Sequence, residues 1–513
     1  MIRWFKSLSR PEGTNVAEAQ FPAHPEKAAP RRRKLRLAAV FTLAALALAG
    51  TPMARAEDKR TPPPDLAGLS GPEAEAFYLG TNAIIWGYPS VLFEQLMRGR
   101  TSPDIVAKGN PQSAVNQFGL VRDLRGPEFK QIATPNNDTV YAQSFVDVSR
   151  EPLVLSVPAV PAPRYYTFQL WDPNGDTFGY VGSRTTGRDA GNFALVGPDW
   201  TGTLPAGLTR IDSPCDGLVI WGRIGVDGPE DLQNALDIQD QLRLTPLSLF
   251  GTSEAQLPPD LAFSDARVAF DPAGVPEDLI LYAELANALR HTPPKPQDAV
   301  VAASLSQIGF SQDGTVFDPS VLTDAQRSGL AKGAQFALHL MDVSSQTAGV
   351  GVNGWRWSPK SGIMGTDYLF RAAFAKWYTG GNAPSEAIYM DARTDNTGAP
   401  LEGTKRYVIR FEKGQEPKVD AFWSISMYHI ADGSFVDNPI KRYSIGDRTR
   451  GLTRAADGSL TVYIQHEAPE DAEARANWLP APADRFYLNL RLYGPDRGLP
   501  DGTWAPPPVM LVQ

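Results

Sequence analysis

The residues Phe486-Tyr487-Leu488-Asn489-Leu490-Arg491-Leu492-Tyr493 alternate between apolar side chains and a second set that includes asparagine and arginine. Successive side chains of a β-strand point to opposite faces, so this alternation predicts a strand with one apolar and one polar face. Strands of this kind are typical of antiparallel sheets whose apolar faces pack together in a sandwich.

Two parts of the chain carry this strand pattern. The first extends from about residue 112 to residue 223 and includes Tyr166, Phe168 and Leu170, which share one face. The second extends from Ala387 to the end of the chain. The 45 glycines and 45 prolines supply the turns that many short strands require. We therefore expect an α+β, β-rich fold, in which two antiparallel β-sandwich, jelly-roll-like domains flank a helical block.

Helices are predicted from apolar residues that recur at helical spacing between about residues 228 and 380, as in Leu279–Leu289. A further helix is expected at the start of the N-terminal domain, where Ser70-Gly71-Pro72-Glu73 has the sequence of a capping box. Pro89 is expected to kink or interrupt that helix, because proline has no amide proton to donate.

The sequence thus predicts five parts with different compositions. They are a secretory signal region at residues 1–56, a proline-rich lead-in at 57–69, a helix plus β domain at 70–227, a helical block at 228–380 and a C-terminal β-sandwich at 381–513.

The signal region has the three components of a secretory signal. A basic stretch, Arg31–Arg36, precedes the 14-residue apolar run Leu37–Gly50, and Ala54-Arg55-Ala56 supplies small residues for cleavage after Ala56. The apolar run is too short to cross roughly 30 Å of bilayer hydrocarbon as a helix. We therefore expect a periplasmic or secreted protein without a membrane anchor once the signal is removed.

The charge of the chain limits the classes of partner it can bind, and its cysteine content limits the sources of its stability. Without residues 1–56 the chain has 39 Lys and Arg residues against 54 Asp and Glu residues. This balance argues against nucleic acid and anionic membranes as partners. Cys215 is the only cysteine, so no intrachain disulfide can form and burial must supply the stability.

The segment Thr134-Pro135-Asn136-Asn137-Asp138-Thr139 is the polar segment that most resembles a ligand site. Its amides, carboxylate and hydroxyls could orient a polar ligand, with Asn136, Asn137 and Thr139 as binding residues and Asp138 as a catalytic candidate. Asn and Asp also bond their own backbone in turns, so the alternative is a structural turn. Arg164 is the expected partner of a ligand anion or hydroxyl.

The C-terminal domain adds further candidates. His429 ends the strand-like run that contains Trp423 and Tyr428, and it is the second catalytic candidate, although a rim histidine is the commoner reading. Trp423, Tyr428 and Trp478 could stack on a sugar or another ring, while Trp478 could instead plug the end of the sandwich.

The short motifs in the sequence do not assign a cofactor site or a metal site. Gly349-Val350-Gly351-Val352-Asn353-Gly354 matches a dinucleotide fingerprint as a string, but no strand precedes it and no helix follows, so we interpret it as a loop. Asp172-Pro173-Asn174-Gly175-Asp176 has some character of a calcium loop, and a tight turn is the better interpretation. The sequence contains no Gly-x-Ser-x-Gly and no His-Glu-x-x-His. We expect no metal and no cofactor.

These segments together resemble a bacterial exported family with two domains of unknown function. The segments that resemble domain 1254 are Thr134–Thr139, Arg164–Tyr166, Gly182–Gly187 and Val196–Trp200. The segments that resemble domain 1214 are Arg406–Val408, Ala421–Ser424, Asn438-Pro439, Asp457–Leu460, Asn477–Pro480 and Arg491–Tyr493. The resemblance implies two jelly-roll-like β-sandwiches around helices and supplies no agreed activity. At His429 the family more often has aspartate, which argues against a catalytic imidazole.

The first functional hypothesis is a periplasmic enzyme that acts on a small polar or glycan-like molecule, with hydrolysis as the candidate reaction. The alternatives are a non-catalytic ligand- or carbohydrate-binding module and a structural or assembly protein of the envelope. A homo-oligomer is left open. An enzyme should have a pocket that contains a carboxylate of perturbed pKa, whereas a binding module should expose an aromatic platform.

Overall fold

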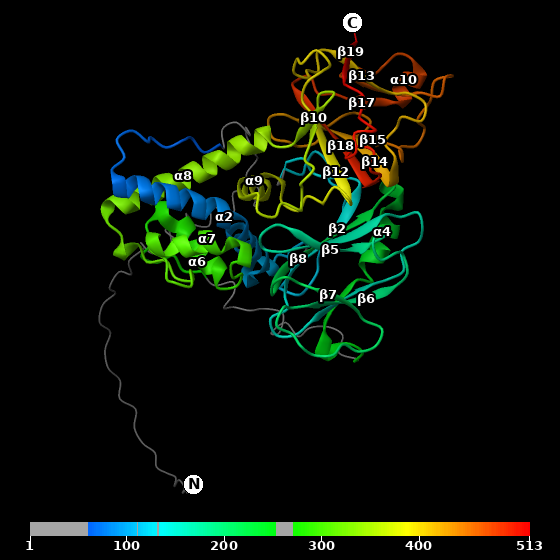
Figure 1. The fold of residues 1–513 in the computed structure, drawn as a ribbon. Helices are drawn as coiled ribbons and strands as arrows, with labels where there is room; N and C mark the ends of the chain where they lie inside the picture. The colour runs from blue at the N-terminus through cyan, green and yellow to red at the C-terminus, as the bar shows by residue number, and fades with distance from the viewer. Residues whose placement is uncertain (1–59, 110, 131–132, 253–269, 513) are drawn as a thin grey trace, which may run out of the picture. The chain divides into compact units, whose positions relative to one another are not determined.

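The computed structural model describes residues 60–109, 111–130, 133–252 and 270–512 (Figure 1). Within these residues the chain forms two β-sandwiches and a group of helices, which confirms the α+β, β-rich fold class. The predicted secretory signal at residues 1–56 lies outside the described residues. In the described part of the chain, no helix combines the length and the apolar character needed to cross a membrane.

The N-terminal sandwich contains nine strands. They are β1 (Gly119–Val121), β2 (Thr139–Asp147), β3 (Leu153–Val157), β4 (Tyr166–Trp171), β5 (Thr177–Gly182), β6 (Gly191–Val196), β7 (Thr209–Asp212), β8 (Gly217–Gly225) and β9 (Arg243–Pro246). One sheet has the order β1-β2-β8-β4-β5 and the other the order β7-β6-β3-β9. The core between them contains Phe168 and Ile220 of the first sheet and Leu155 and Leu195 of the second.

The C-terminal sandwich contains ten strands. They are β10 (Val350–Val352), β11 (Trp355–Trp357), β12 (Ala387–Ala392), β13 (Arg406–Phe411), β14 (Val419–His429), β15 (Ser444–Gly446), β16 (Leu460–Gln465), β17 (Trp478–Pro480), β18 (Phe486–Pro495) and β19 (Met510–Val512). The sheet orders are β10-β11-β12-β18-β14-β15 and β17-β16-β13-β19. The strand pairs of both sandwiches are antiparallel except β6–β7 and β16–β17. The fingerprint-like string at Gly349–Gly354, interpreted above as a loop, forms most of the β10–β11 hairpin.

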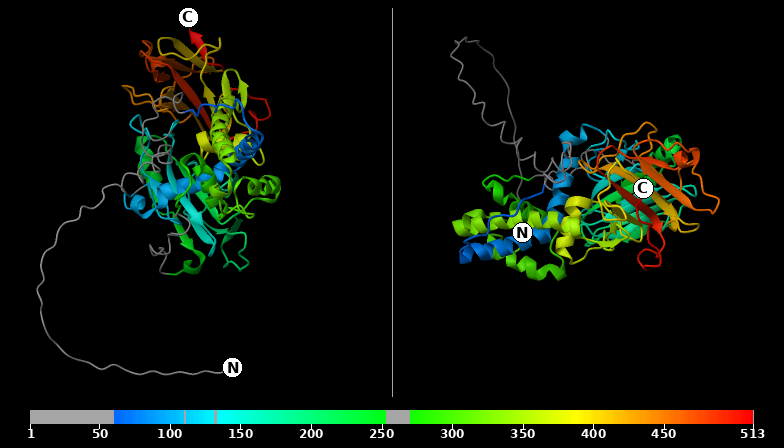
Figure 2. Two further views of the ribbon diagram at one scale, coloured as in Figure 1. Left: turned by 90° about the vertical axis from the view of Figure 1, so that its left-hand side faces the viewer. Right: turned by 90° about the horizontal axis from the view of Figure 1, so that it is seen from above.

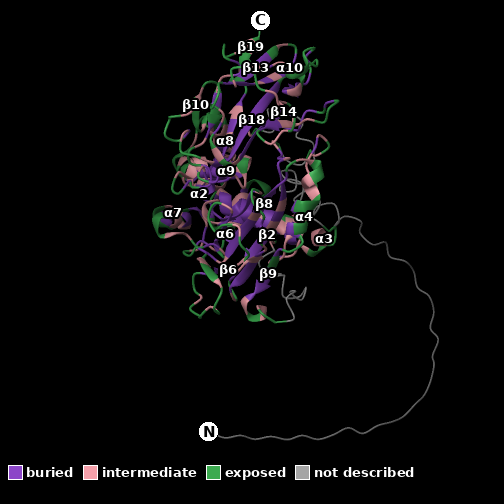
Figure 3. Ribbon diagram, turned by 90° about the vertical axis from the view of Figure 1, so that its right-hand side faces the viewer, coloured by how far each residue is buried: buried purple, intermediate pink, exposed green. Residues whose placement is uncertain are grey.

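The polar face of β18 is buried, although the sequence pattern alone would allow it to face solvent. Asn489 and Arg491 are 4% and 3% exposed, and Figure 3 shows β18 as a buried strand. Arg491 donates hydrogen bonds to the carbonyl oxygens of Thr134 and Pro135, which precede β2. The alternation therefore predicts the strand and its core face correctly, and the polar face forms the contact between the two sandwiches.

The described helices are α2 (Gly71–Thr101), α3 (Pro103–Val106), α4 (Leu232–Gln239), α6 (Ile280–Leu289), α7 (Ala299–Ser304), α8 (Asp324–Thr347), α9 (Tyr368–Tyr378) and α10 (Ala472–Ala476). Helix α2 lies beside α8, and both pack with α6 and α9, as Figures 1 and 2 show. A Cβ at Gly329 would lie 2.2 Å from the carbonyl oxygen of Glu73, so this close crossing of α8 and α2 requires glycine.

The capping box at Ser70 is confirmed, but the expected interruption at Pro89 is wrong. Helix α2 continues through Pro89. Because Pro89 cannot donate to the preceding turn, that turn lacks one hydrogen-bond donor. In a regular α-helix that donor would serve the carbonyl oxygen of Ile85. Arg371 of α9 donates to the carbonyl oxygen of the next residue, Trp86, at 3.0 Å.

Two domain borders differ from the predicted positions. Strand β9 pairs with β3, and Ile238 of α4 packs in the N-terminal core, so the N-terminal sandwich continues to Pro246. Strand β11 pairs with β12, so the C-terminal sheet receives strands from within the expected helical block. Local periodicity reports helix or strand, whereas tertiary pairing decides to which sandwich a short element belongs.

Candidate functional site

The polar segment before β2 is largely occupied by contacts within the protein. The Asn136 side chain donates to the hydroxyl oxygens of Thr139 and Tyr493, each at 3.0 Å, and accepts from the backbone N–H of Asp138. Asn137 is half-buried, and its Oδ1 is buried without a hydrogen-bond partner in the described structure. Of the predicted ligand-binding amides, only Asn137 therefore retains an unused polar atom.

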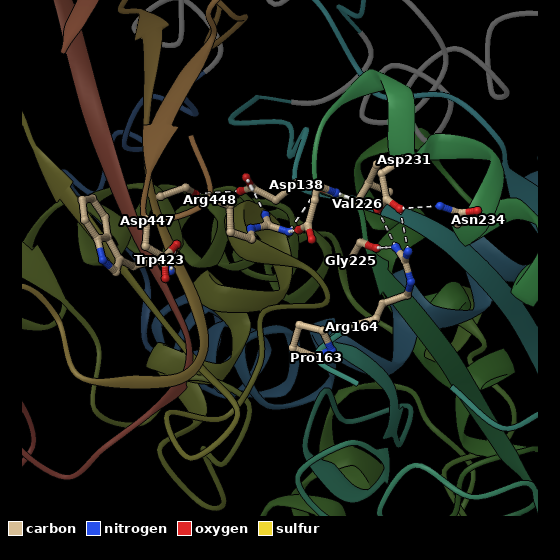
Figure 4. Close-up of polar contacts among 12 residues, drawn as sticks. Asp138, Pro163, Arg164, Gly225, Val226, Asp231, Asn234, Trp423, Asp447 and Arg448 are labelled. Carbon is tan, nitrogen blue, oxygen red and sulfur yellow. Dashed lines mark hydrogen bonds and ion pairs between the residues drawn. The ribbon is translucent and has the colours of Figure 1, made fainter. Parts of the chain in front are cut away.

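Asp138 connects the two sandwiches. Its Oδ2 accepts a hydrogen bond from the Ser424 hydroxyl of β14 at 2.7 Å, and both residues are buried. Its Oδ1 lies 3.3 Å from Nη2 of Arg448, which follows β15. Figure 4 shows Arg448 beside Asp138, and Nη1 of Arg448 donates to Asp227 at 2.8 Å. The Arg448 guanidinium carbon lies 3.4 Å from the centre of the Phe422 ring. We call Asp138, Ser424 and Arg448 the interdomain clasp.

Arg164, the predicted partner of a ligand anion, is paired within its own domain. Its guanidinium forms two hydrogen bonds of 2.7 Å to the Asp231 carboxylate and a third to the carbonyl oxygen of Gly225 (Figure 4). The hydrogen bond from Arg164 holds the pKa of the Asp231 carboxyl well below its ordinary range. The pair fixes the start of β4 to the segment before α4 and engages both Nη atoms of Arg164.

The two catalytic candidates are not brought together. Asp138 bonds Ser424 on one face of β14, whereas His429 is five residues further along and shares the phase of Trp423 on the other face. Five residues of extended strand span roughly 16 Å. Burial lowers the pKa of the half-buried His429 imidazole. Asp138 and His429 therefore do not form a catalytic pair in this fold.

The three aromatic candidates are buried. Trp423, Tyr428 and Trp478 are 3%, 0% and 5% exposed. The Tyr428 hydroxyl donates to the carbonyl oxygen of Pro135, and the Trp478 indole N–H donates to that of Gln465 at 2.8 Å. Trp478 is thus buried beside β16, and these three rings form no exposed platform.

An open groove of about 830 Å³ lies in the C-terminal sandwich. Trp423 lies at the groove with its ring packed on Phe411, and the backbone N–H of Trp423 donates to Oδ1 of Asp447 at 3.1 Å. The lining residues are Glu416, Pro417, Lys418, Val419, Asp420, Trp423, Asp447, Thr449, Gly451, Leu452, Arg454, Leu460 and Asp496. A volume of this size is typical of sites for small molecules.

Asp447 is a groove carboxyl whose pKa is raised toward neutrality. Its environment raises the pKa to about 6, mainly through desolvation by the surrounding residues, with a smaller contribution from the negative charge of Asp138. The backbone N–H of Trp423 and the charge of Arg448 act in the opposite direction. Asp447 faces the groove, so its carboxyl can exchange protons with a bound molecule near neutral pH. Sequence reasoning missed it because Ile445-Gly446-Asp447-Arg448 matches no motif and the desolvation depends on the fold.

The groove has a mixed but mainly acidic lining. Glu416 is paired with Arg454, which leaves Asp420, Asp447 and Asp496 with Lys418. Across the ranges that the structure describes, no group of three or more His, Cys, Asp or Glu side chains is arranged to hold a metal ion. This lining suits a neutral polyhydroxylated molecule or one with a cationic group.

The segment with calcium-loop character is a turn that a lysine holds. Oδ1 of Asp172 accepts the backbone N–H groups of Asn174 and Asp176, and its Oδ2 lies 2.7 Å from Nζ of Lys295. The Lys295 ammonium thus supplies the positive charge beside the buried Asp172 carboxylate.

Comparison with known proteins finds matches to two family models and to several solved structures. Residues 115–246 match Protein of unknown function (DUF1254), and residues 386–497 match Protein of unknown function (DUF1214). The crystal structure of the VPA0106 protein from Vibrio parahaemolyticus has a TM-score of 0.65 at 23% identity and covers 85% of this chain and 100% of its own. An uncharacterised protein from Burkholderia cenocepacia has a TM-score of 0.40 at 14% identity, with 86% and 95% covered. No curated protein matches this sequence.

Proposed function

We propose that this chain, which carries a DUF1254 region followed by a DUF1214 region, is an exported enzyme that acts on a small polar or glycan-like molecule in the groove at Asp447. The observation that carries the proposal is the placement of Asp447 in a groove large enough for such a molecule, beside the Trp423 backbone. The predicted secretory signal at residues 1–56 supports export.

The chemistry that Asp447 could perform is proton transfer. A carboxyl with a pKa of about 6 has both protonation states populated near neutral pH, so it can donate a proton to a leaving oxygen or accept one from water. Hydrolysis of a glycosidic or ester bond uses both transfers, because water adds to one fragment and the leaving oxygen takes up a proton. Lys418 and Arg454 provide donors for substrate hydroxyl or carbonyl oxygens at the groove wall.

The experiment begins with a thermal-shift screen of purified residues 57–513 against sugars, esters, aromatic acids and divalent metals. A ligand at 100 times its dissociation constant adds about 2.7 kcal/mol of stability, which is visible in the unfolding midpoint. Compounds that shift the midpoint are then tested for turnover. Loss of a general acid or base costs 10²–10⁴-fold in rate, so Asp447→Asn should lower kcat by about that factor with little change in KM.

A matched control separates chemistry from groove charge. Asp496→Asn removes an exposed carboxylate from the same groove and should change KM more than kcat. A binding module is the second candidate, and the same groove would serve it. Ligand binding that persists in every variant without any turnover would favour the binding module over the enzyme.

Export is tested separately from activity. Expression of the full chain in a bacterial host, followed by cell fractionation and N-terminal sequencing, should yield a periplasmic protein that begins at Glu57. A cytoplasmic protein that retains residues 1–56 would contradict the export part of the proposal.

A further inference from the structure

A second group of polar residues lies on the outer face of the N-terminal sheet β1-β2-β8-β4-β5. Val140 and Ala142 of β2 point into the sandwich core, so Tyr141 and Gln143 lie on the outer face. The register pairs Tyr141 with Arg223 and Gln143 with Trp221 of β8. None of these four residues lines the groove at Asp447.

Arg223 is a buried cation with neutral partners. It is 5% exposed, and its guanidinium donates to Oε1 of Gln169, Oδ1 of Asn382 and the carbonyl oxygen of Gly380, at 3.2, 3.2 and 2.6 Å. Its guanidinium carbon lies 5.7 Å from the centre of the Tyr141 ring. Amide oxygens and an aromatic face hold the arginine in place, but they do not neutralise its charge.

Arg100, in the last turn of α2, brings a second cation to the same face. Nη1 of Arg100 donates to Oε1 of Gln143 at 2.9 Å, and burial lowers the pKa of its guanidinium. Gln143 and Arg223 are diagonal neighbours across β2 and β8, and the Cβ atoms of such neighbours are about 7–8 Å apart. Gln143, which binds Arg100, and Arg223 therefore occupy neighbouring positions of one sheet.

Neither arginine has an acidic partner among the described residues. The structure gives no ion pair or hydrogen bond from Arg100 or Arg223 to a carboxylate in those ranges. Glu386 is the buried carboxylate that follows Asn382, and it is already bonded by the Tyr165 hydroxyl and by Arg184. Among the described residues, Arg223 is thus a buried cation without a counter-charge, which is costly and which a bound anion would relieve.

The residues around Arg223 are partly exposed at the protein surface. Arg100, Tyr141, Gln143 and Trp221 are each partly exposed, while Arg223 is buried beneath them. The indole Nε1 of Trp221 is a buried donor with no hydrogen-bond partner in the described structure. Two guanidinium groups and a free indole N–H are all donors, and the Tyr141 and Trp221 rings lie with their centres 6.4 Å apart.

We propose that Arg100, Arg223 and Trp221 form a second binding site, which takes the anionic group of a small carboxylate- or phosphate-bearing molecule. The guanidinium groups bind the anion through charge-assisted hydrogen bonds, and the Trp221 indole donates a further one. The rings of Trp221 and Tyr141 provide a surface for a planar part of the ligand. This site is independent of the proposed hydrolysis at Asp447.

The test uses purified residues 57–513 at low ionic strength and two probes, sodium benzoate and inorganic phosphate. Binding is followed by tryptophan fluorescence and by the unfolding midpoint, with benzamide as the neutral analogue of benzoate and sodium chloride as the salt control. Arg100→Gln removes the partly exposed cation, whereas Arg223→Lys keeps the buried charge but changes its geometry. Arg210→Gln is the matched control, because Arg210 is an exposed arginine of the other sheet, paired with Asp212.

We expect saturable binding of benzoate or phosphate, no binding of benzamide, and at least a tenfold weakening in Arg100→Gln. Arg223→Lys should also weaken binding, and Arg210→Gln and Asp447→Asn should leave it unchanged. Binding of benzoate alone identifies a ring-bearing carboxylate as the ligand class, and binding of phosphate alone identifies a phosphate. The proposal is overturned if neither anion acts beyond the effect of equal sodium chloride, or if Arg100→Gln binds like the unmodified protein.

Discussion

Removal of the Asp138 carboxylate and of the Ser424 hydroxyl, singly and together, measures how strongly the interdomain clasp joins the two sandwiches. The hydroxyl donates to the carboxylate at 2.7 Å, and the two residues are 3% and 6% exposed. Ser424→Ala leaves one carboxylate oxygen without its donor. Asp138→Ala also removes the contact with Arg448, which still keeps Asp227 as a partner.

The expected magnitudes follow from these contacts. A buried hydrogen bond to a charged group contributes about 1.5–3 kcal/mol, so Ser424→Ala should lower the free energy of unfolding by about that amount. The partly exposed Arg448–Asp138 ion pair adds about 0–1 kcal/mol to the effect of Asp138→Ala. The double-mutant cycle should then give a coupling energy of about 1.5–3 kcal/mol for the Asp138–Ser424 pair.

The assay is urea unfolding of the four proteins, followed by tryptophan fluorescence and far-UV circular dichroism. A matched control is the pair Asp318 and Ser320, in which the same atoms form a 2.6 Å hydrogen bond at the surface. The control cycle should give a coupling energy below about 1 kcal/mol. A coupling energy near zero for Asp138 and Ser424 would refute the clasp and would leave the Asp138 carboxylate free for another role.

Three further predictions test other parts of the structure. Asp447→Asn should be more stable than the unmodified protein above pH 6, and the difference in stability should vanish below about pH 4. The reason is that the folded-state pKa of about 6 exceeds the ordinary value of 3.8, so folding disfavours the ionised carboxylate. Thermal unfolding midpoints measured across this pH range check the prediction. Lys295→Met should lower the free energy of unfolding in urea by about 3–5 kcal/mol, because it leaves the Asp172 carboxylate buried and unpaired. Adding Asp172→Asn to the same chain should restore part of that stability. An unchanged stability of Lys295→Met would contradict the pairing. Trp478→Phe should cost about 1 kcal/mol through the lost bond to Gln465 and leave ligand-induced thermal shifts unchanged, whereas a lost shift would restore Trp478 as a ligand residue.

The strands and their core faces could be predicted from the sequence because period-two alternation has a direct physical cause. Trp423, Ile425 and Met427 share the core as expected. Whether the other face is buried could not be predicted, because the sequence pattern around Ser424 and Arg491 would be the same if they faced solvent or a second domain. Burial of the polar face therefore depends on which elements dock on it.

The polar segment illustrates the same limit for the site. Its composition correctly marks Asn136 and Asp138 as residues that make specific hydrogen bonds, but composition does not say with what. The partners, Tyr493 and Ser424, lie 357 and 286 positions away along the chain. The pKa of Asp447 has the same origin, because the desolvation that raises it comes from residues gathered by the fold.

The polar segment joins the domains, and we propose that the ligand site is the groove at Asp447. The most direct test is a thermal-shift titration of one stabilising ligand with the unmodified protein, Asp447→Asn and Asn137→Ala. We expect Asp447→Asn to reduce or abolish the shift and Asn137→Ala to keep it. A shift that is lost in Asn137→Ala and unchanged in Asp447→Asn would contradict this assignment and return the ligand site to the polar segment.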